Sequence, residues 1–186
     1  MATASVLPYH FVNTMSGTKY SKLIEDPAEY GHLIKRAARP LLVVGSWAVT
    51  RSLLGKPIID YAVEIAKTLN IPICATAHSK KKLLELGVEP ASSYDIIEIL
   101  NHLKDPAWKG VKKEGNHDLV MFMGFRTDLA EQGLSTLKHY APHLKTMTLC
   151  KYYYPNASYS LPNYRKDEQW QEFLDKLIAN LKEKEA

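Results

Sequence analysis

The chain has 186 residues and a formal net charge of +4, and 46% of its residues are hydrophobic and 24% charged. This size and composition are typical of one globular domain with a sizeable core. The mild charge argues against nucleic acid as a partner, because nucleic-acid binders usually carry a strong basic face and the densest basic run here is only Lys80–Lys82.

Membrane, secreted and cluster-binding proteins are also disfavoured. No run approaches the roughly 18 consecutive apolar residues of a membrane span. The first residues lack the basic and then apolar pattern of a secretory signal. The two cysteines, Cys74 and Cys150, are too few for a disulfide scaffold or for ligating an iron–sulfur cluster. We therefore expect a cytoplasmic protein without a membrane partner.

The first half of the chain predicts alternating helices and strands. Asp26-Pro27 marks a helix start, because Asp is a favoured cap and Pro suits the first helical position. Arg39–Gly45 is a short apolar run without polar alternation, which is typical of a strand buried on both faces of a parallel sheet. A helix with a clear 3.6-residue period begins at Pro57 and ends at Asn70, and Ile71–Ala75 is the second strand.

The second half continues this alternation. Ser92, with Asp95 three residues later, has the spacing of a capping box at the start of a helix. Leu119–Met123 is the third strand, and Thr127 is expected to cap the next helix. Leu144–Cys150 alternates threonine with apolar residues, which predicts a fourth strand near an edge of the sheet.

The end of the chain is rich in aromatic residues. A C-terminal helix is predicted from a strong apolar stripe, made by Trp170, Phe173, Leu174, Leu177, Ile178 and Leu181. Before it, residues 151–166 hold five of the eleven tyrosines, namely Tyr152, Tyr153, Tyr154, Tyr159 and Tyr164. Tyrosine is enriched at protein interfaces, so we favour a partner-binding role for this segment over a loop that covers the domain's own sheet edge.

The order of these elements predicts an α/β fold in three layers with a mostly parallel sheet. Residues 1–25 show no period and are expected to form an irregular arm, whose aromatic residues are a second candidate surface for a partner. Residues 26–186 are expected to form a single α/β domain.

A ligand in such a sheet normally binds in the crevice beyond the carboxyl ends of the strands. The residues expected there are Gly45, Ser46, Thr76, Gly124, Phe125 and Arg126. They form no nucleotide motif, because the glycines of G-x-G-x-x-G are missing after Gly45, no acid follows the second strand, and no P-loop is present. We therefore expect a generic binding crevice for a cofactor at these six positions.

No other set of residues indicates catalysis. The seven histidines are scattered, so no metal site is expected, since zinc needs three or four converging ligands. Neither a C-x-x-C nor a G-x-S-x-G motif occurs. Arg126 and Lys151 follow strand ends and either meet phosphates at the ligand edge or project into solvent; the sequence leaves both open.

Three segments carry a resemblance to a known family: Arg39-Pro-Leu-Leu-Val-Val-Gly45, Asn70-Ile-Pro-Ile-Cys-Ala75, and Asp118-Leu-Val-Met-Phe-Met-Gly124. With the length, the arm and the C-terminal helix, the chain resembles the epsilon subunit of archaeal CO dehydrogenase/acetyl-CoA decarbonylase/synthase complexes. The resemblance rests on patterned segments and not on a catalytic motif, so it transfers no catalytic residue to this chain.

The resemblance implies a fold like the flavin- or nucleotide-binding middle domain of thiamine-diphosphate enzymes. It also implies an accessory, non-catalytic subunit in a homo- or hetero-oligomer with the large CO dehydrogenase subunit. That partner carries the nickel–iron–sulfur cluster and further iron–sulfur clusters. The role implied for the small subunit is to stabilise the large one or to assist electron transfer to flavin, so FAD is the cofactor to test in the crevice.

The alternative is a free-standing enzyme or binding protein that uses a nucleotide-like cofactor in the same crevice. The absence of any paired acid–base or nucleophile constellation in the sequence argues against it.

Overall fold

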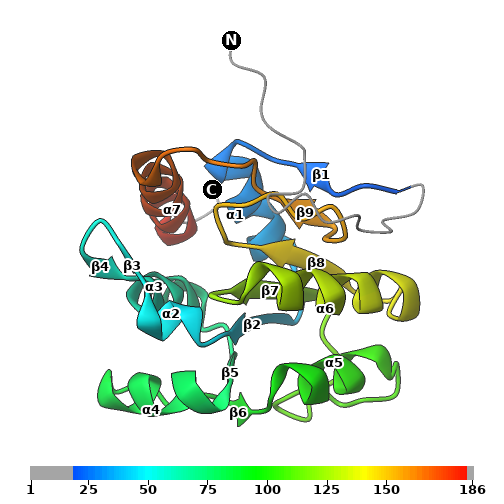
Figure 1. Cartoon of the computed structure of the whole chain (residues 1–186). Coiled ribbons are helices and arrows are strands. Elements are labelled where there is room, and N and C mark those ends of the chain that lie inside the picture. The colour runs from blue at the N-terminus through cyan, green and yellow to red at the C-terminus, as the bar shows by residue number, and fades with distance from the viewer. Residues whose placement is uncertain (1–18, 184–186) are drawn as a thin grey trace.

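The computed structural model describes residues 19–183, which form an α/β fold in three layers (Figure 1). The predicted fold class is confirmed, whereas the likeness to a thiamine-diphosphate enzyme domain stays a prediction. In the described residues the central sheet has seven strands, all paired in parallel. In spatial order they are β1 (Lys22–Leu23), β9 (Tyr159–Ser160), β8 (Lys145–Thr148), β7 (Leu119–Met123), β2 (Pro40–Val44), β5 (Ile73–Ala75) and β6 (Ser92–Ser93).

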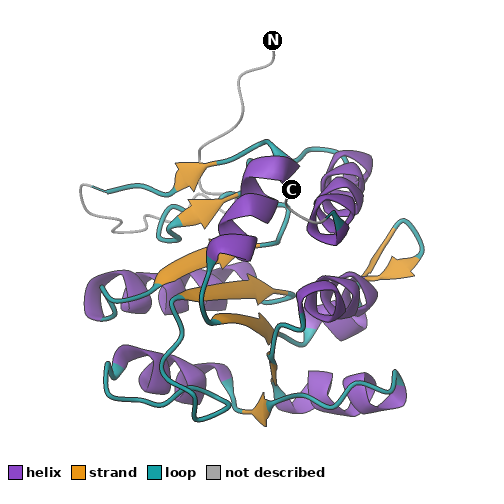
Figure 2. Cartoon of the chain, turned by 180° about the vertical axis from the view of Figure 1, so that it is seen from behind, coloured by secondary structure: helices purple, strands orange, loops and turns teal. Residues whose placement is uncertain are grey.

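Helices cover both faces of this sheet (Figure 2). The helices on one face are α1 (Pro27–Arg36), α2 (Trp47–Thr50), α3 (Ile58–Leu69), α4 (Ala77–Glu85) and α7 (Asp167–Lys182). The other face is covered by α5 (Ile96–Lys104) and α6 (Thr127–Tyr140). A small antiparallel hairpin, β3 (Ser52–Leu53) with β4 (Lys56–Pro57), follows α2 and was not predicted.

The central strand β2 explains why its sequence shows no polar alternation. Leu42 and Val44 belong to the core under α1, α3 and α7, whereas Leu41 and Val43 belong to the core under α5 and α6. All four side chains are fully buried. A parallel strand covered on both faces needs apolar residues at every position, so the strand predicted at 39–45 is confirmed.

Local sequence signals predict the bounds or buried faces of α1, α3 and α7 correctly. Asp26 caps α1, because its side chain accepts a hydrogen bond from the Ala28 backbone N–H at 2.9 Å. The end of α3 is also as predicted, since Asn70 closes it in the left-handed conformation that Asn tolerates well. The C-terminal helix is confirmed as α7, and all six residues of its predicted apolar stripe are buried.

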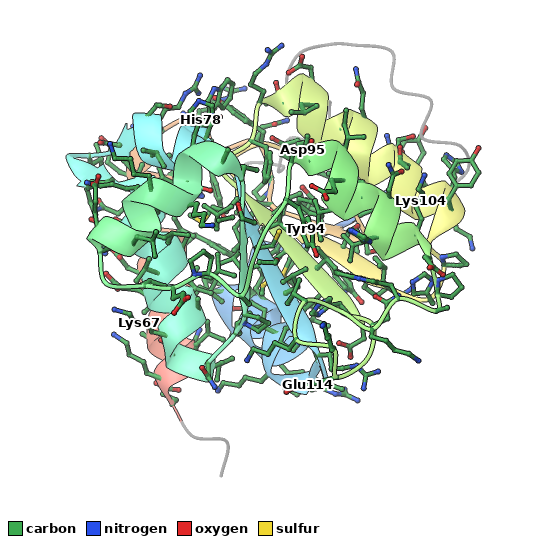
Figure 3. All side chains as sticks on the ribbon, turned by 90° about the horizontal axis from the view of Figure 1, so that it is seen from below. Lys67, His78, Tyr94, Asp95, Lys104 and Glu114 are labelled. Atoms are coloured by element: carbon green, nitrogen blue, oxygen red, sulfur yellow. The ribbon has the colours of Figure 1, made fainter. Side chains whose placement is uncertain are left out.

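The predicted capping box at Ser92 is wrong. Ser92 and Ser93 form the edge strand β6, and Asp95 itself is the cap of α5, accepting from the Glu98 backbone N–H at 2.9 Å (Figure 3). Ser92, three residues before Asp95, instead pairs through its backbone with Cys74 of β5. Thr127 is likewise the first residue of α6 and not its cap. Arg126 occupies the cap position, and among residues 19–183 its side chain makes no capping hydrogen bond to the helix backbone.

This correction can be measured. Asp95→Ala is expected to lower the free energy of unfolding by about 1 kcal/mol, because the first turn of α5 loses its capping acceptor. Ser92→Ala is the matched control and should change it by less than about 0.5 kcal/mol, since within residues 19–183 the Ser92 hydroxyl has no nitrogen or oxygen partner at hydrogen-bond distance. Urea denaturation of the two variants decides between the caps, and a larger loss in Ser92→Ala would restore the capping box.

The prediction that the fourth strand lies near a sheet edge is also wrong. β9 and β1 extend the sheet beyond β8. The threonines of β8 are buried and not solvent-facing, at 3% and 1% exposure for Thr146 and Thr148. Their hydroxyls stay satisfied, because Thr146 accepts from the Ser158 backbone N–H at 3.0 Å and Thr148 lies 3.2 Å from the Ser160 hydroxyl.

The tyrosine-rich segment 151–166 packs largely onto the domain itself, and a partner-binding role for its half-buried tyrosines stays a prediction. It contributes β9, and Tyr153 and Tyr154 are only 4% and 2% exposed. The Tyr153 hydroxyl donates to the Ser21 backbone carbonyl at 3.1 Å, which ties this segment to the N-terminal strand. Of the predicted arm, residues 19–25 are described and include β1, and residues 1–18 lie outside the described part.

Candidate functional site

The six residues predicted to line a crevice follow three neighbouring strands. β2 lies between β7 and β5, so their carboxyl ends share one edge of the sheet. The connections are held together by the backbone: Gly45 N–H donates to the Met123 carbonyl at 2.9 Å, and Trp47 N–H to the Gly124 carbonyl at 2.8 Å. On the other side, Thr76 N–H donates to the Val44 carbonyl at 3.2 Å.

The two glycines of the crevice face the protein itself. A Cβ atom at Gly45 would lie 2.4 Å from the Gly124 carbonyl oxygen and 2.7 Å from the Phe125 ring. Gly124 has φ +76°, and a Cβ there would lie 2.5 Å from both the Cβ and the N of Ala48. The close approach that glycine permits is therefore used to pack the β2–α2 and β7–α6 connections against each other.

The polar members of the predicted set are also engaged in the fold. Thr76 lies 3.2 Å from the Ser79 hydroxyl, and Ser79 donates to the Val44 carbonyl at 2.8 Å. Ser46 precedes α2, and its carbonyl accepts from Thr50. Arg126 is mostly exposed and donates to both carboxylate oxygens of Asp128, at 3.1 and 2.6 Å, so it points along its own helix and away from the crevice.

An open cavity lies beside the predicted crevice, displaced toward the end of β8. It measures about 130 Å³. We call it the strand-end cavity, and it is lined by Trp47, Arg51, Ser52, Leu53, Ile58, Gly124, Phe125, Cys150, Lys151, Tyr152, Tyr154, Asp167 and Trp170. Two of the predicted residues, Gly124 and Phe125, therefore reach it, while Gly45, Ser46, Thr76 and Arg126 are not part of its wall.

The polar rim of this cavity carries two cations and one acid. The Arg51 guanidinium lies 3.3 Å from the centre of the Trp47 ring, a cation–π contact that fixes its position. Lys151 pairs with Asp167 at 2.6 Å. Of the two strand-end cations considered from the sequence, Lys151 therefore faces the ligand edge and Arg126 does not.

Two buried groups lie deeper in the wall. Burial raises the pKa of the Cys150 thiol, and the charge of Arg51 opposes that rise. Burial likewise raises the pKa of Tyr154 well above its usual value. Both groups are therefore neutral near pH 7. Cys74 is fully buried in the core with a pKa also raised by burial, as expected for a structural cysteine.

The predicted crevice leaves little room for FAD next to Gly45. The space above Gly45 is filled by Gly124 and by the Phe125 ring. The neighbouring strand-end cavity, about 130 Å³, is comparable to a cavity of about 150 Å³ that holds benzene, which is far smaller than a whole dinucleotide. Flavin binding at the six residues stays a prediction, and it requires Phe125 to move.

Sequence reasoning missed Arg51, Tyr154 and the buried acid Glu131. Arg51 lies in the unpredicted hairpin region, and Tyr154 is one of five similar tyrosines, so neither had a distinguishing signal. Glu131 is 3% exposed on α6 and accepts from the Asn156 side chain at 2.6 Å and backbone at 3.2 Å. The sequence does contain a sign that Glu131 is buried. Glu131 precedes Leu134 by three residues, which places it on the border of the buried stripe of α6.

The described residues 19–183 contain no group of three His, Cys, Asp or Glu side chains arranged to hold a metal ion. Among the same residues, no helix combines the length and the apolar character that crossing a membrane requires.

Comparison with known proteins places the chain in a family. A family profile described as CO dehydrogenase beta subunit/acetyl-CoA synthase epsilon subunit matches residues 2–178. The chain is 42% identical over 165 residues to the acetyl-CoA decarbonylase/synthase complex subunit epsilon of Methanothermobacter thermautotrophicus, covering 89% of this chain and 91% of that relative.

Similar relatives occur in other archaea. Subunit epsilon 1 of Archaeoglobus fulgidus is 36% identical over 83% of this chain and 82% of its own. Subunit epsilon 1 of Methanosarcina barkeri is 35% identical over 90% of this chain and 94% of its own. The resemblance noted in the sequence is thereby confirmed, and the chain belongs to the CO dehydrogenase beta subunit/acetyl-CoA synthase epsilon subunit family.

Proposed function

We propose that this chain is an accessory, non-catalytic subunit that stabilises the large nickel–iron–sulfur subunit of a CO dehydrogenase/acetyl-CoA decarbonylase/synthase complex. The observation that carries the proposal is family membership across residues 2–178, among relatives whose names describe a subunit of such a complex. The state of the chain's own polar groups agrees with it. Thr76, Arg126 and Lys151 are all engaged by neighbouring groups of the fold and make no catalytic constellation.

The alternative is a free-standing enzyme or binding protein with a nucleotide-like cofactor, and a related idea is that the subunit assists electron transfer to flavin. Both need an open crevice at the strand ends. Phe125 and the Gly124 carbonyl fill the space above Gly45, so we favour the stabilising role over either.

The proposal is tested by anaerobic affinity purification from the source cells with the tagged full chain as bait. We expect a large partner in about equal amount, containing nickel and iron and reducing a dye with CO as electron donor. Recovery of the chain alone, without either metal, would overturn the proposal and favour the hypothesis of a free-standing enzyme or binding protein. A titration of the purified chain with FAD then separates the two alternatives from each other.

A further inference from the structure

We propose that the strand-end cavity binds a small, mostly apolar carboxylate with a body about the size of one six-membered ring. This inference does not depend on the proposed subunit role, because it rests on the walls of the cavity alone.

The size and the walls of the cavity set the body of the ligand. Its volume of about 130 Å³ is close to that of an apolar cavity, about 150 Å³, that binds benzene. Leu53, Phe125 and Trp170 line it and are 1%, 5% and 6% exposed. Such walls favour an apolar ring or a short branched chain.

One buried donor in the wall, the Tyr154 hydroxyl, lacks a strong hydrogen-bond partner among the described residues. Tyr154 is 2% exposed, and within residues 19–183 its hydroxyl has no nitrogen or oxygen partner at hydrogen-bond distance. The hydroxyl lies beside the Cys150 thiol, which is a weak partner. Cys150 and Tyr154 both line the cavity, so the hydroxyl lies in or just behind its wall. A buried polar group without a partner costs free energy, and an acceptor atom on a ligand would satisfy it.

The charged residues at the rim indicate whether the ligand's acceptor group is neutral or negatively charged. Arg51 and Lys151 are cations, and only Asp167 opposes them among the charged residues of the wall. Arg51 is held over Trp47, and its charge reaches the Cys150 thiol next to Tyr154. An anionic acceptor between Arg51 and Tyr154 is therefore favoured, and a carboxylate on a ring-sized body meets both the charge and the volume.

Benzoate is the probe for this site, with benzyl alcohol as its uncharged counterpart. We expect benzoate to bind the full chain saturably, one molecule per chain, in a calorimetric titration. The same binding should change the tryptophan fluorescence, because Trp47 and Trp170 lie in the wall. Benzyl alcohol should bind at least tenfold more weakly, since a charged acceptor gains more from the Arg51 guanidinium than a neutral one.

Two variants locate the binding. Tyr154→Phe and Arg51→Gln are each expected to weaken benzoate binding about tenfold or more. Their matched controls, Tyr140→Phe and Arg126→Gln, change exposed residues outside the cavity and should leave binding unchanged. Arg51→Gln decides the matter if Tyr154→Phe does not fold. The proposal is overturned if benzoate does not saturate the chain, if benzyl alcohol binds equally well, or if both cavity variants bind benzoate as the unchanged chain does.

Discussion

Gly124→Ala is expected to lower the free energy of unfolding by about 2 to 5 kcal/mol. Two costs combine at this position. The left-handed conformation at φ +76° costs an alanine about 1 to 2 kcal/mol. In addition, the new Cβ would lie 2.5 Å from the Cβ and N of Ala48, and such overpacking typically costs about 1 to 3 kcal/mol. Because one of the clashing atoms belongs to the backbone of α2, the clash cannot be relieved by a side-chain rotation.

Gly87→Ala is the matched control for this prediction. Gly87 has a similar φ of +68°, but a Cβ there would meet nothing within 4 Å. We expect a loss of only about 1 kcal/mol, from the conformation alone. Urea denaturation of both variants measures the difference. Equal losses would show that the packing of the β2–α2 and β7–α6 connections contributes nothing.

The second large effect concerns Glu131 and pH. Burial raises the pKa of Glu131 from the ordinary value of 4.5 to about 7, and the hydrogen bonds from Asn156 and the charge of Lys138 oppose that rise. The folded chain therefore binds more protons than the unfolded chain between these two values. Ionisation of Glu131 therefore leaves the free energy of unfolding unaffected below about pH 4.5, and lowers it as the pH rises through about 7. The total loss is about 3 kcal/mol, since one pKa unit corresponds to about 1.4 kcal/mol.

Glu131→Gln should remove this dependence. The amide keeps the acceptor that bonds Asn156 and cannot ionise. At pH 9 the variant is expected to be about 3 kcal/mol more stable than the unchanged chain, and at pH 4.5 about equally stable. Glu172→Gln, an exposed change, is the control and should alter stability by less than about 1 kcal/mol at either pH. If the variant is no more stable than the unchanged chain at pH 9, the carboxylate is tolerated in its buried place.

The fold class followed from the sequence because buried parallel strands and amphipathic helices leave direct patterns. β2 is apolar at each position since both of its faces are covered, and α7 shows its stripe since one face packs on the sheet. The caps did not follow in the same way, because a serine near the start of a helix satisfies the same local rule whether it caps the helix or pairs in an edge strand, as Ser92 does.

Features that depend on distant pairing could not be read from the sequence. The alternation of threonines with apolar residues predicts β8 near an edge of the sheet, but β9 and β1 extend the sheet beyond it and Thr146 and Thr148 are buried. The tyrosines of residues 151–166 have the composition of an interface, yet Tyr153 bonds Ser21, far away in the sequence. Composition indicates the kind of contact that a residue makes, but not whether the partner lies in the same chain.

In the candidate site, too, some features could be predicted from the sequence and others depend on contacts between distant segments. The topological rule located the correct edge of the sheet, and Gly124 and Phe125 do line its cavity. Gly45 was expected to leave room for a ligand, but the Phe125 ring takes that room. A glycine next to a strand end permits a close approach, and the sequence cannot say whether a ligand or the chain itself makes it.

The most direct test of the proposed role compares the large nickel–iron–sulfur subunit with and without this chain under anaerobic conditions. CO-dependent dye reduction is measured as an initial rate and then as a half-life during incubation at raised temperature. A stabilising subunit predicts an unchanged initial rate and a several-fold longer half-life when the chain is present. A higher initial rate with an unchanged half-life would contradict the account, because the chain would then take part in turnover and not in maintaining its partner.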